Sequence, residues 1–589
     1  MSVPPIRRWD RETAILAWLT AWVSIFSFLF YFRRGDVLLY GDAVAHINIA
    51  RRVFDSRTPG LLQLGTVWLP LPHLLMIPFL FSNWMWKTGM GGSIPSMTAY
   101  VFGTLGIFRL LRSALRSSQT DNAARIAAWG AATIYGANPN LIYLQSTAMT
   151  EPLYLALFIW ALVYFNEFVQ WSWDADGRSG EASASSSLLK CGICLAAACL
   201  TRYDGWFLAV AMSAAYLLVA LRFMTLRVKQ KQRSPAPRGR LTNFLLLAAA
   251  APMLWLAYNA IVYRNPLEFA NGPYSAKAIE QRTPGASHPG SRDLPVAFSY
   301  FLKSAELNQA SGNWQRVWVL LALGGTLVCL IVALPSRRLS GGRPARRAEG
   351  ETPSGQPAGP ALSFSKGCRR YWPLLLLWTP LPFYVLSVAY GGVPIFMPVW
   401  WPFSYYNVRY GLELLPAFAI FVPLACYFVA TLMRRQSVRL ASMTVALIFV
   451  VASYASIWRD PVCSREASIN SRTRIALEHE LAGFIKALPP DSTMLMYLGN
   501  HVGALQEAGV PLRRVINEGN HRTWKQPVDL EGLWERALAN PAQYADFVIA
   551  FEGDPVSTGI QKQQFFPIAV IRVSGQPEGT IYQTRGRSR

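Results

Sequence analysis

Long apolar runs alternate with short polar segments over most of this 589-residue chain. Most runs approach about 20 residues, which lets an α-helix cross a hydrocarbon core of about 30 Å. The pattern predicts about eleven membrane-spanning helices, at residues 13–32, 94–111, 123–138, 148–169, 188–201, 206–224, 241–263, 314–334, 371–390, 408–432 and 438–458. The expected fold class is an all-α polytopic membrane protein of the kind that also carries a soluble domain.

That soluble domain follows the last apolar run. Residues 459–589 are polar, and the segments 493–498, 546–551 and 568–573 alternate as strands do, while 473–488 has helical periodicity. About 130 residues suffice for a small α/β domain. We therefore expect a transmembrane domain at 1–458 and an α/β domain at 459–589.

The first polar loop is long, covering residues 33–92. Within it, 43–55 has one apolar and one charged face, which predicts a helix on the membrane surface. The apolar stretch 68–86 contains three prolines and is either a full span or a juxtamembrane, re-entrant segment. A full span would turn the basic loop at 109–125 to the outside, so we adopt the second interpretation.

Composition supports a membrane protein. The chain is 52% hydrophobic and only 15% charged, whereas soluble domains average about 25% charged residues. Its net charge of +23 comes from Lys and Arg in short loops such as 227–240 and 337–370, as the positive-inside rule describes, and does not indicate nucleic-acid binding. We expect a multi-pass protein of the bacterial inner membrane, with Asp42 and the C-terminal domain outside the cytoplasm.

Asp42 is the leading catalytic candidate. A carboxylate at the mouth of a membrane bundle is costly to desolvate and is by default a functional group. It can accept a proton from an attacking hydroxyl as a general base, and His46, four residues later, shares its helix face. The structural alternative is that Asp42 caps the helix at 43–55.

Other polar motifs open on the same predicted side. Glu151 begins a span, although a Thr-Glu-Pro sequence also suits helix capping. Arg202 suits a phosphate ligand or an ion pair with Asp204. Arg409 at a span start either binds an anion or pairs with Glu413. Their convergence predicts one active site.

The sequence offers little sign of a metal or cofactor. Asp174-Ala175-Asp176 resembles a DxD metal motif, but the predicted topology places it on the cytoplasmic side, where a solvated loop explains it. We expect no bound metal and no cofactor.

Three of these motifs resemble the GT-C superfamily of membrane glycosyltransferases, especially the protein O-mannosyltransferase and aminoarabinose transferase type (family 39-like). Asp42 has the position of the superfamily's catalytic carboxylate, and Pro70 and Pro72 lie in its Pro-rich loop. Arg409-Tyr410 with Pro416 resembles the span start associated with a lipid-phosphate donor. One departure is Ala43, where many relatives carry a second acidic residue.

The resemblance implies an inverting, metal-independent glycosyltransferase that uses a polyprenyl-phosphate sugar, is mannosyltransferase-like, and acts on an unknown protein, lipid or glycan acceptor. The candidate substrate-binding residues are His46, Glu151, Arg202, Tyr203, Asp204, Tyr274, Lys277, Asn407, Arg409 and Tyr410. The alternatives are a transporter or flippase, which predicts mid-span polar residues and internal repeats, and a glycan ligase or oligosaccharyltransferase.

Overall fold

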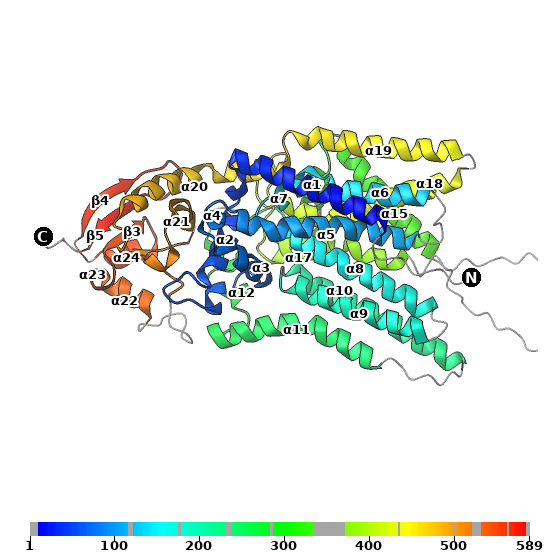
Figure 1. Ribbon diagram of the computed structural model, residues 1–589, viewed down its shortest axis with the longest axis horizontal. Helices are drawn as coiled ribbons and strands as arrows, with labels where there is room; N and C mark the ends of the chain where they lie inside the picture. Colours follow the sequence, from blue (N-terminus) through cyan, green and yellow to red (C-terminus); the bar gives the residue numbers. More distant parts are fainter. Residues whose placement is uncertain are drawn as a thin grey trace, which may run out of the picture.

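The computed structural model describes residues 10–115, 122–174, 178–230, 238–282, 287–333, 371–433, 436–499, 501–520, 532–561, 563 and 565–584. A helical bundle lies at one end and a small β-sheet at the other (Figure 1). We call the end of the bundle that faces the sheet the sheet end. The predictions for Ala175 and Asp176, and for most of the two basic loops (231–237 and 337–370), lie outside the described residues.

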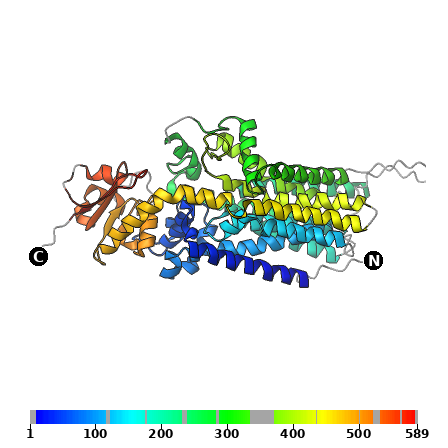
Figure 2. The same ribbon diagram turned by 90° about the horizontal axis from the view of Figure 1, so that it is seen from above.

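The bundle consists of long helices that run roughly along the long axis (Figures 1 and 2). Short 3-10 segments, η4 (Trp372–Trp378) and η5 (Val408–Leu414), lead into two of them. Among the described residues, ten helices are long and apolar enough to cross a membrane, so the predicted polytopic class is confirmed. The bundle helices are α1 (Arg11–Arg34), α5 (Met90–Ala114), α6 (Asn122–Gly136), α8 (Glu151–Asp174), α9 (Arg178–Cys199), α10 (Asp204–Gln230), α11 (Arg238–Tyr263), α15 (Trp314–Ala333), α17 (Pro380–Tyr390), α18 (Leu415–Leu432) and α19 (Gln436–Trp458).

One of the eleven predicted spans, 123–138, corresponds to a helix that is too short to cross the hydrocarbon core. α6 has 15 residues, or about 22 Å, which is less than the hydrocarbon thickness. The apolar run ends because Asn138 caps a new helix, α7 (Pro139–Gln145), by accepting from the backbone N–H groups of Asn140 and Leu141. Reading the run to residue 138 therefore overestimated the element.

The first loop folds into the short elements η1 (Asp36–Leu38), α2 (Gly41–Arg52), η2 (Leu61–Leu64), α3 (Leu71–Leu80) and α4 (Asn83–Lys87). α3 has ten residues, about 15 Å, so it is too short to cross a membrane, in keeping with the juxtamembrane interpretation of 68–86. The helix predicted for the membrane surface is α2, and it is enclosed instead: even Arg51 on its charged face is buried.

The helices and strands that follow residue 458, which we call the C-terminal elements, enclose that charged face of α2. Asn48 donates to Gln506 Oε1 at 2.6 Å, and Asp55 accepts from the backbone N–H groups of Leu512 (3.3 Å) and Arg513 (3.2 Å). Sequence periodicity finds an amphipathic helix but does not reveal which surface pairs with its polar side. α2 is therefore held between the bundle and the C-terminal elements.

A five-stranded sheet forms the far end, with strand order β2-β1-β3-β5-β4. β1 is parallel to β2 and β3, whereas β5 is antiparallel to β3 and β4. Alternate residues of β1 face opposite sides, with Met494 and Met496 in the large core and Leu495 in a second cluster around Trp534. The elements are α20 (Val462–Ala487), β1 (Met494–Met496), α21 (Val502–Ala508), η6 (Leu512–Arg514), β2 (Val515–Ile516), α22 (Leu533–Ala539), α23 (Pro541–Tyr544), β3 (Phe547–Phe551), α24 (Pro555–Ile560), β4 (Phe566–Ile571) and β5 (Gly579–Gln583).

The sequence predicted β1, β3, β4 and the second half of α20, and it missed β2 and β5. β2 has only two residues, too few to show an alternation. Three further short helices lie between spans: α12 (Glu268–Asn271), α13 (Ala276–Arg282) and α14 (Leu294–Leu307).

Candidate active site

Polar residues from five separate elements meet at the sheet end of the bundle. They come from the first turn of α2, the start of α8, the turn between α9 and α10, η5, and α20. Ion pairs and hydrogen bonds connect Asp42, Glu151, Arg202, Asp204, Arg409 and Glu466. The structure thus brings together five of the eleven candidate site residues with Glu466, and we call this group of six the carboxylate–arginine cluster.

Arg409 is the centre of one half of the cluster. Its Nη2 donates to Asp42 Oδ2 at 2.5 Å, its Nε to Glu151 Oε1 at 3.1 Å and its Nη1 to Glu466 Oε1 at 3.1 Å. Glu151 and Glu466 are buried, whereas the Asp42 side chain is 41% exposed. Asp42 is therefore the partner of Arg409 that an incoming molecule can reach.

Arg202 is the centre of the other half, and Glu151 Oε1 joins the two, at 3.2 Å from Arg202 Nη1. The other contacts of Arg202 are with buried groups: Tyr384 hydroxyl (2.7 Å), Thr150 Oγ1 (3.1 Å), Asp204 Oδ2 (3.3 Å) and Glu413 Oε1 (3.7 Å). Each nitrogen of this guanidinium thus has a protein partner.

The ring of Tyr410 lies between the two arginines. Its centroid is 5.0 Å from the guanidinium carbon of Arg409 and 5.4 Å from that of Arg202. Cation–π contacts of this kind are attractive when desolvated. Tyr410 thus packs against both arginines of the cluster, and its predicted substrate-binding role stays a prediction.

The alternative pairing of Arg409 with Glu413 does not form, because Glu413 contacts Arg202. Both residues lie in η5, and a 3-10 helix has three residues per turn, so positions four apart do not share a face. Both carboxylate oxygens of Glu413 are buried without a hydrogen bond. The i+4 argument failed because it assumed an α-helix.

The capping alternative for Asp42 also differs from the structure. The N-cap residue of α2 is Tyr40, and no side chain makes the cap hydrogen bond. Asp42 lies in the first helical turn, where its carboxylate also meets the positive end of the helix dipole. Its Oδ2 accepts a hydrogen bond from Arg409, and the partly exposed carboxylate stays accessible at the surface of the cluster.

His46 is buried, and its ring hydrogen-bonds with His73 and not with Asp42. Its Nδ1 is 2.9 Å from His73 Nε2, and its ring makes an edge contact with Trp68 at 4.9 Å between centroids. Burial, with the positive fields of Arg202 and Arg409, lowers the pKa of His46 to about 3. The imidazole is therefore neutral at physiological pH.

Tyr203 and Asn407 shape the surroundings of the cluster. The Tyr203 hydroxyl donates to Val67 carbonyl at 3.0 Å, and its ring stacks on Phe269. Asn407 adopts a left-handed backbone (φ 56°), which Asn tolerates better than most residues, and donates to Pro394 carbonyl at 2.9 Å. Both contacts hold loops in place.

Tyr274 and Lys277 lie on the segment between α11 and α14. Tyr274 hydrogen-bonds Tyr497 of the C-terminal elements, and Lys277 is exposed, with its backbone close to Gly392. The described contacts of these residues do not join the cluster, so their predicted binding roles stay predictions.

Sequence reasoning missed Glu466 and Tyr384. Glu466 was missed because the helical pattern was recognised only from residue 473, although α20 begins at Val462. Polar residues at 463, 466, 470 and 474 repeat with helical spacing, and this signal was available. Tyr384 carries no distinguishing pattern.

Metal-ligand groupings are a separate question. Within the described residues there is no group of three or more His, Cys, Asp or Glu side chains arranged to hold a metal ion. The cluster instead pairs its carboxylates with guanidinium groups.

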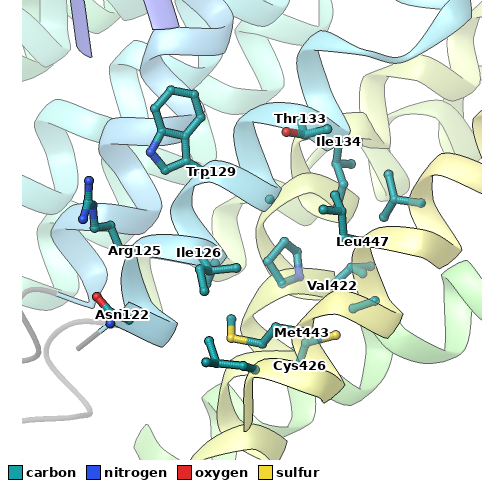
Figure 3. Close-up of a pocket in the computed structure, with 16 residues that line it drawn as sticks. Asn122, Arg125, Ile126, Trp129, Thr133, Ile134, Val422, Cys426, Met443 and Leu447 are labelled. Atoms are coloured by element: carbon teal, nitrogen blue, oxygen red, sulfur yellow. The ribbon is translucent and has the colours of Figure 1, made fainter. Parts of the chain in front are cut away.

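A cavity of about 420 Å³ lies elsewhere in the bundle, between α6, α18 and α19 (Figure 3). Its lining is mostly apolar, with side chains such as Ile134, Val422, Met443 and Leu447. Since it contains no carboxylate and no member of the cluster, it offers no group for acid–base chemistry.

Comparison with known structures identifies the fold. The crystal structure of ArnT from Cupriavidus metallidurans bound to undecaprenyl phosphate matches with a TM-score of 0.51 and 12% identity, over 96% of this chain and 99% of that chain. The chain has a GT-C fold.

The crystal structure of the Archaeoglobus fulgidus oligosaccharyltransferase tethered to an acceptor peptide matches this GT-C chain more weakly. Its TM-score is 0.43 at 10% identity, over 92% of this chain and 69% of that chain. No family model matches the sequence, and no curated protein matches it. The resemblance drawn from three short motifs is thus confirmed at the level of the fold.

Proposed function

We propose that this protein is an inverting membrane glycosyltransferase that transfers a sugar from a polyprenyl-phosphate donor to an acceptor hydroxyl. The observation that carries the proposal is the pair formed by half-exposed Asp42 and buried Arg409 at 2.5 Å, at one end of a GT-C bundle. A base beside a phosphate-binding cation is what such a transfer requires.

Asp42 acts as the general base in this proposal. Arg409 engages its Oδ2, and Oδ1 accepts the proton of the acceptor hydroxyl. The hydroxyl oxygen forms a bond to the anomeric carbon while the bond from that carbon to the donor phosphate oxygen breaks. Attack from the face opposite the leaving group inverts the anomeric configuration.

Arg409 binds the leaving phosphate. A guanidinium has five N–H groups, and three of its nitrogens contact Asp42, Glu151 and Glu466, so two N–H groups remain. Hydrogen bonds from a guanidinium to a phosphate strengthen as charge develops on the departing oxygen. Arg202 supports this arrangement through Glu151, and exposed Lys277 is a second candidate phosphate contact.

The donor class follows from chemistry and likeness together. The ArnT structure with the same fold holds undecaprenyl phosphate. The spanning helices of this chain place it in a bilayer, where an isoprenoid tail can lie. The acceptor is a hydroxyl of a protein, lipid or glycan.

We also propose that the sheet end faces the periplasm or lumen. The basic sequences at 227–240 and 337–370 lie between α10 and α11 and between α15 and η4, and the predicted alternation of spans puts them on the side opposite Asp42, which the positive-inside rule assigns to the cytoplasm. In this proposal the protein lies in a bacterial inner membrane, with the cluster and the C-terminal domain on the periplasmic side.

The test is transfer of radiolabelled sugar from a panel of polyprenyl-phosphate sugars to a membrane acceptor fraction, in proteoliposomes of the purified protein. Transfer with EDTA present, and with the opposite anomeric configuration in the product, supports the proposal. Movement of a polyprenyl-phosphate sugar across the vesicle membrane without any transfer contradicts it and favours a flippase.

A further inference from the structure

One face of α20 carries four polar residues, three of which contact the site or its supports, while Asn470 donates to the Tyr405 carbonyl. Cys463, Glu466, Asn470 and Arg474 are spaced three or four positions apart, so they form one stripe along the helix. α20 runs between the bundle and the sheet in both views (Figures 1 and 2). Its stripe is the part of the C-terminal elements that meets the carboxylate–arginine cluster.

Glu466 contacts both the Arg409 side chain and the backbone of the residue before it. Its Oε1 accepts from Arg409 Nη1 at 3.1 Å, and its Oε2 accepts from the backbone N–H of Val408 at 2.7 Å. The Glu466 side chain is 1% exposed. One buried carboxylate thus fixes both the guanidinium and the local backbone of Arg409.

The same stripe holds the chain just before Asp42. The hydroxyl of Tyr40 donates to Cys463 carbonyl at 2.9 Å and lies 3.4 Å from Glu466 Oε1. Arg474 Nη2 donates to the carbonyls of Leu38 (2.9 Å) and Leu39 (3.0 Å). α20 therefore contacts the supports of both Asp42 and Arg409.

The second half of α20 is fixed by the sheet. Leu477, Leu481 and Ile485 are buried in the same core as Met494 and Met496 of β1. Because one helix carries both these buried residues and Glu466, the packing of its second half among the C-terminal elements helps to fix where Glu466 lies.

We propose that Glu466 is a positioning residue for sugar transfer, an inference that rests on the function proposed above. It does not touch the reacting atoms. It sets the guanidinium of Arg409, and through Tyr40 the start of α2, at the separation that donor binding and proton transfer require. The C-terminal domain thereby supports the active site through α20.

The test compares Glu466→Gln, which removes the charge at constant size, with Glu466→Asp. Glu480→Gln, an exposed carboxylate on the same helix, is the matched control. We measure kcat and both KM values in proteoliposomes, with the polyprenyl-phosphate sugar that supports wild-type transfer. Glu466→Gln is expected to raise the donor KM about tenfold and lower kcat, with the acceptor KM unchanged.

Glu466→Asp is expected to recover part of the wild-type kcat and donor KM, and Glu480→Gln is expected to keep the wild-type kcat and KM values. A folded Glu466→Gln protein with the wild-type donor KM overturns the inference while wild-type transfer keeps the proposed function intact. Absence of transfer by the wild type from every polyprenyl-phosphate sugar removes the function and the inference together.

Tyr40→Phe carries the test if Glu466→Gln does not fold. This change removes one hydroxyl and leaves the ring packed, and it is expected to lower kcat about threefold because the start of α2 loses its tie to α20. Wild-type kcat in a folded Tyr40→Phe protein then contradicts the inference.

Discussion

The two arginines of the cluster have similar surroundings but differ in the exposure of their carboxylate partners. Both contact Glu151, and both lie against Tyr410. Arg409 reaches the half-exposed carboxylate of Asp42, whereas the contacts of Arg202 end on buried Tyr384, Thr150 and Asp204. Of the two arginines, Arg409 is the one with a partner carboxylate that an incoming molecule can reach, which is why the proposed reaction is placed there.

Of the changes that compare the two arginines, Arg409→Lys is expected to have the largest effect. Arg409→Lys keeps one positive charge but cannot contact three carboxylates and a phosphate at once, because an ammonium lacks the planar fork. Transfer is expected to fall about 100-fold, the order seen when one transition-state donor is removed. Initial rates per folded protein in proteoliposomes measure this, and a loss below threefold would remove Arg409 from the donor site.

Arg202→Lys is expected to act mainly on stability. The substitution leaves buried Glu151, Asp204 and Glu413 with fewer partners, which costs about 3 kcal/mol. Chemical unfolding in mixed micelles measures the change, with activity per folded protein as the second readout. A larger loss of activity than in Arg409→Lys, without destabilisation, would reverse the comparison.

Acid stability gives a smaller effect. Unfolded His46 binds a proton near pH 6.5, whereas the folded side chain stays neutral until about pH 3, so stability falls as pH drops from about 6.5. At pH 5 this amounts to about 2 kcal/mol, or 1.4 kcal/mol for each pH unit. Unfolding at pH 7, 6 and 5 measures it, and His46→Gln is expected to reduce the pH dependence by one proton. An unchanged slope would show that His46 is not held neutral.

Glu413→Gln is expected to have the smallest effect. Glu413 is 3.7 Å from Arg202, and both of its oxygens are buried without a hydrogen bond, so its charge is poorly compensated. Replacing such a charge by a neutral group of the same shape changes stability by less than about 1 kcal/mol, in the stabilising direction. The same unfolding assay checks this, and a strongly destabilised variant would mean that Glu413 supports Arg202 as firmly as Glu151 does.

The sequence predicted what repeats locally. Apolar runs located the ten spanning helices, and the prolines of 68–86 marked a segment that does not span. The position of Asp42 at the mouth of the bundle was enough to make it a catalytic candidate without knowledge of its partner.

Partners were harder to predict because they depend on contacts between distant segments. Arg409 and Asp42 are 367 positions apart, and Glu466 comes from a helix whose start looked like ordinary soluble sequence. The pairing of Arg409 with Glu413 was predicted for an α-helix, and the 3-10 geometry of η5 prevents it. Local patterns therefore found the candidate groups, whereas the fold determined which of them pair.

Transfer by Asp42→Asn beside the wild type tests the central claim most directly. The substitution keeps the shape and one hydrogen-bond acceptor for Arg409 but removes the base. Both proteins are assayed with the donor that supports wild-type transfer, with EDTA present and with folding checked by thermal denaturation. The account predicts a loss of about 1,000-fold in a folded Asp42→Asn protein; wild-type rates in that variant would contradict it.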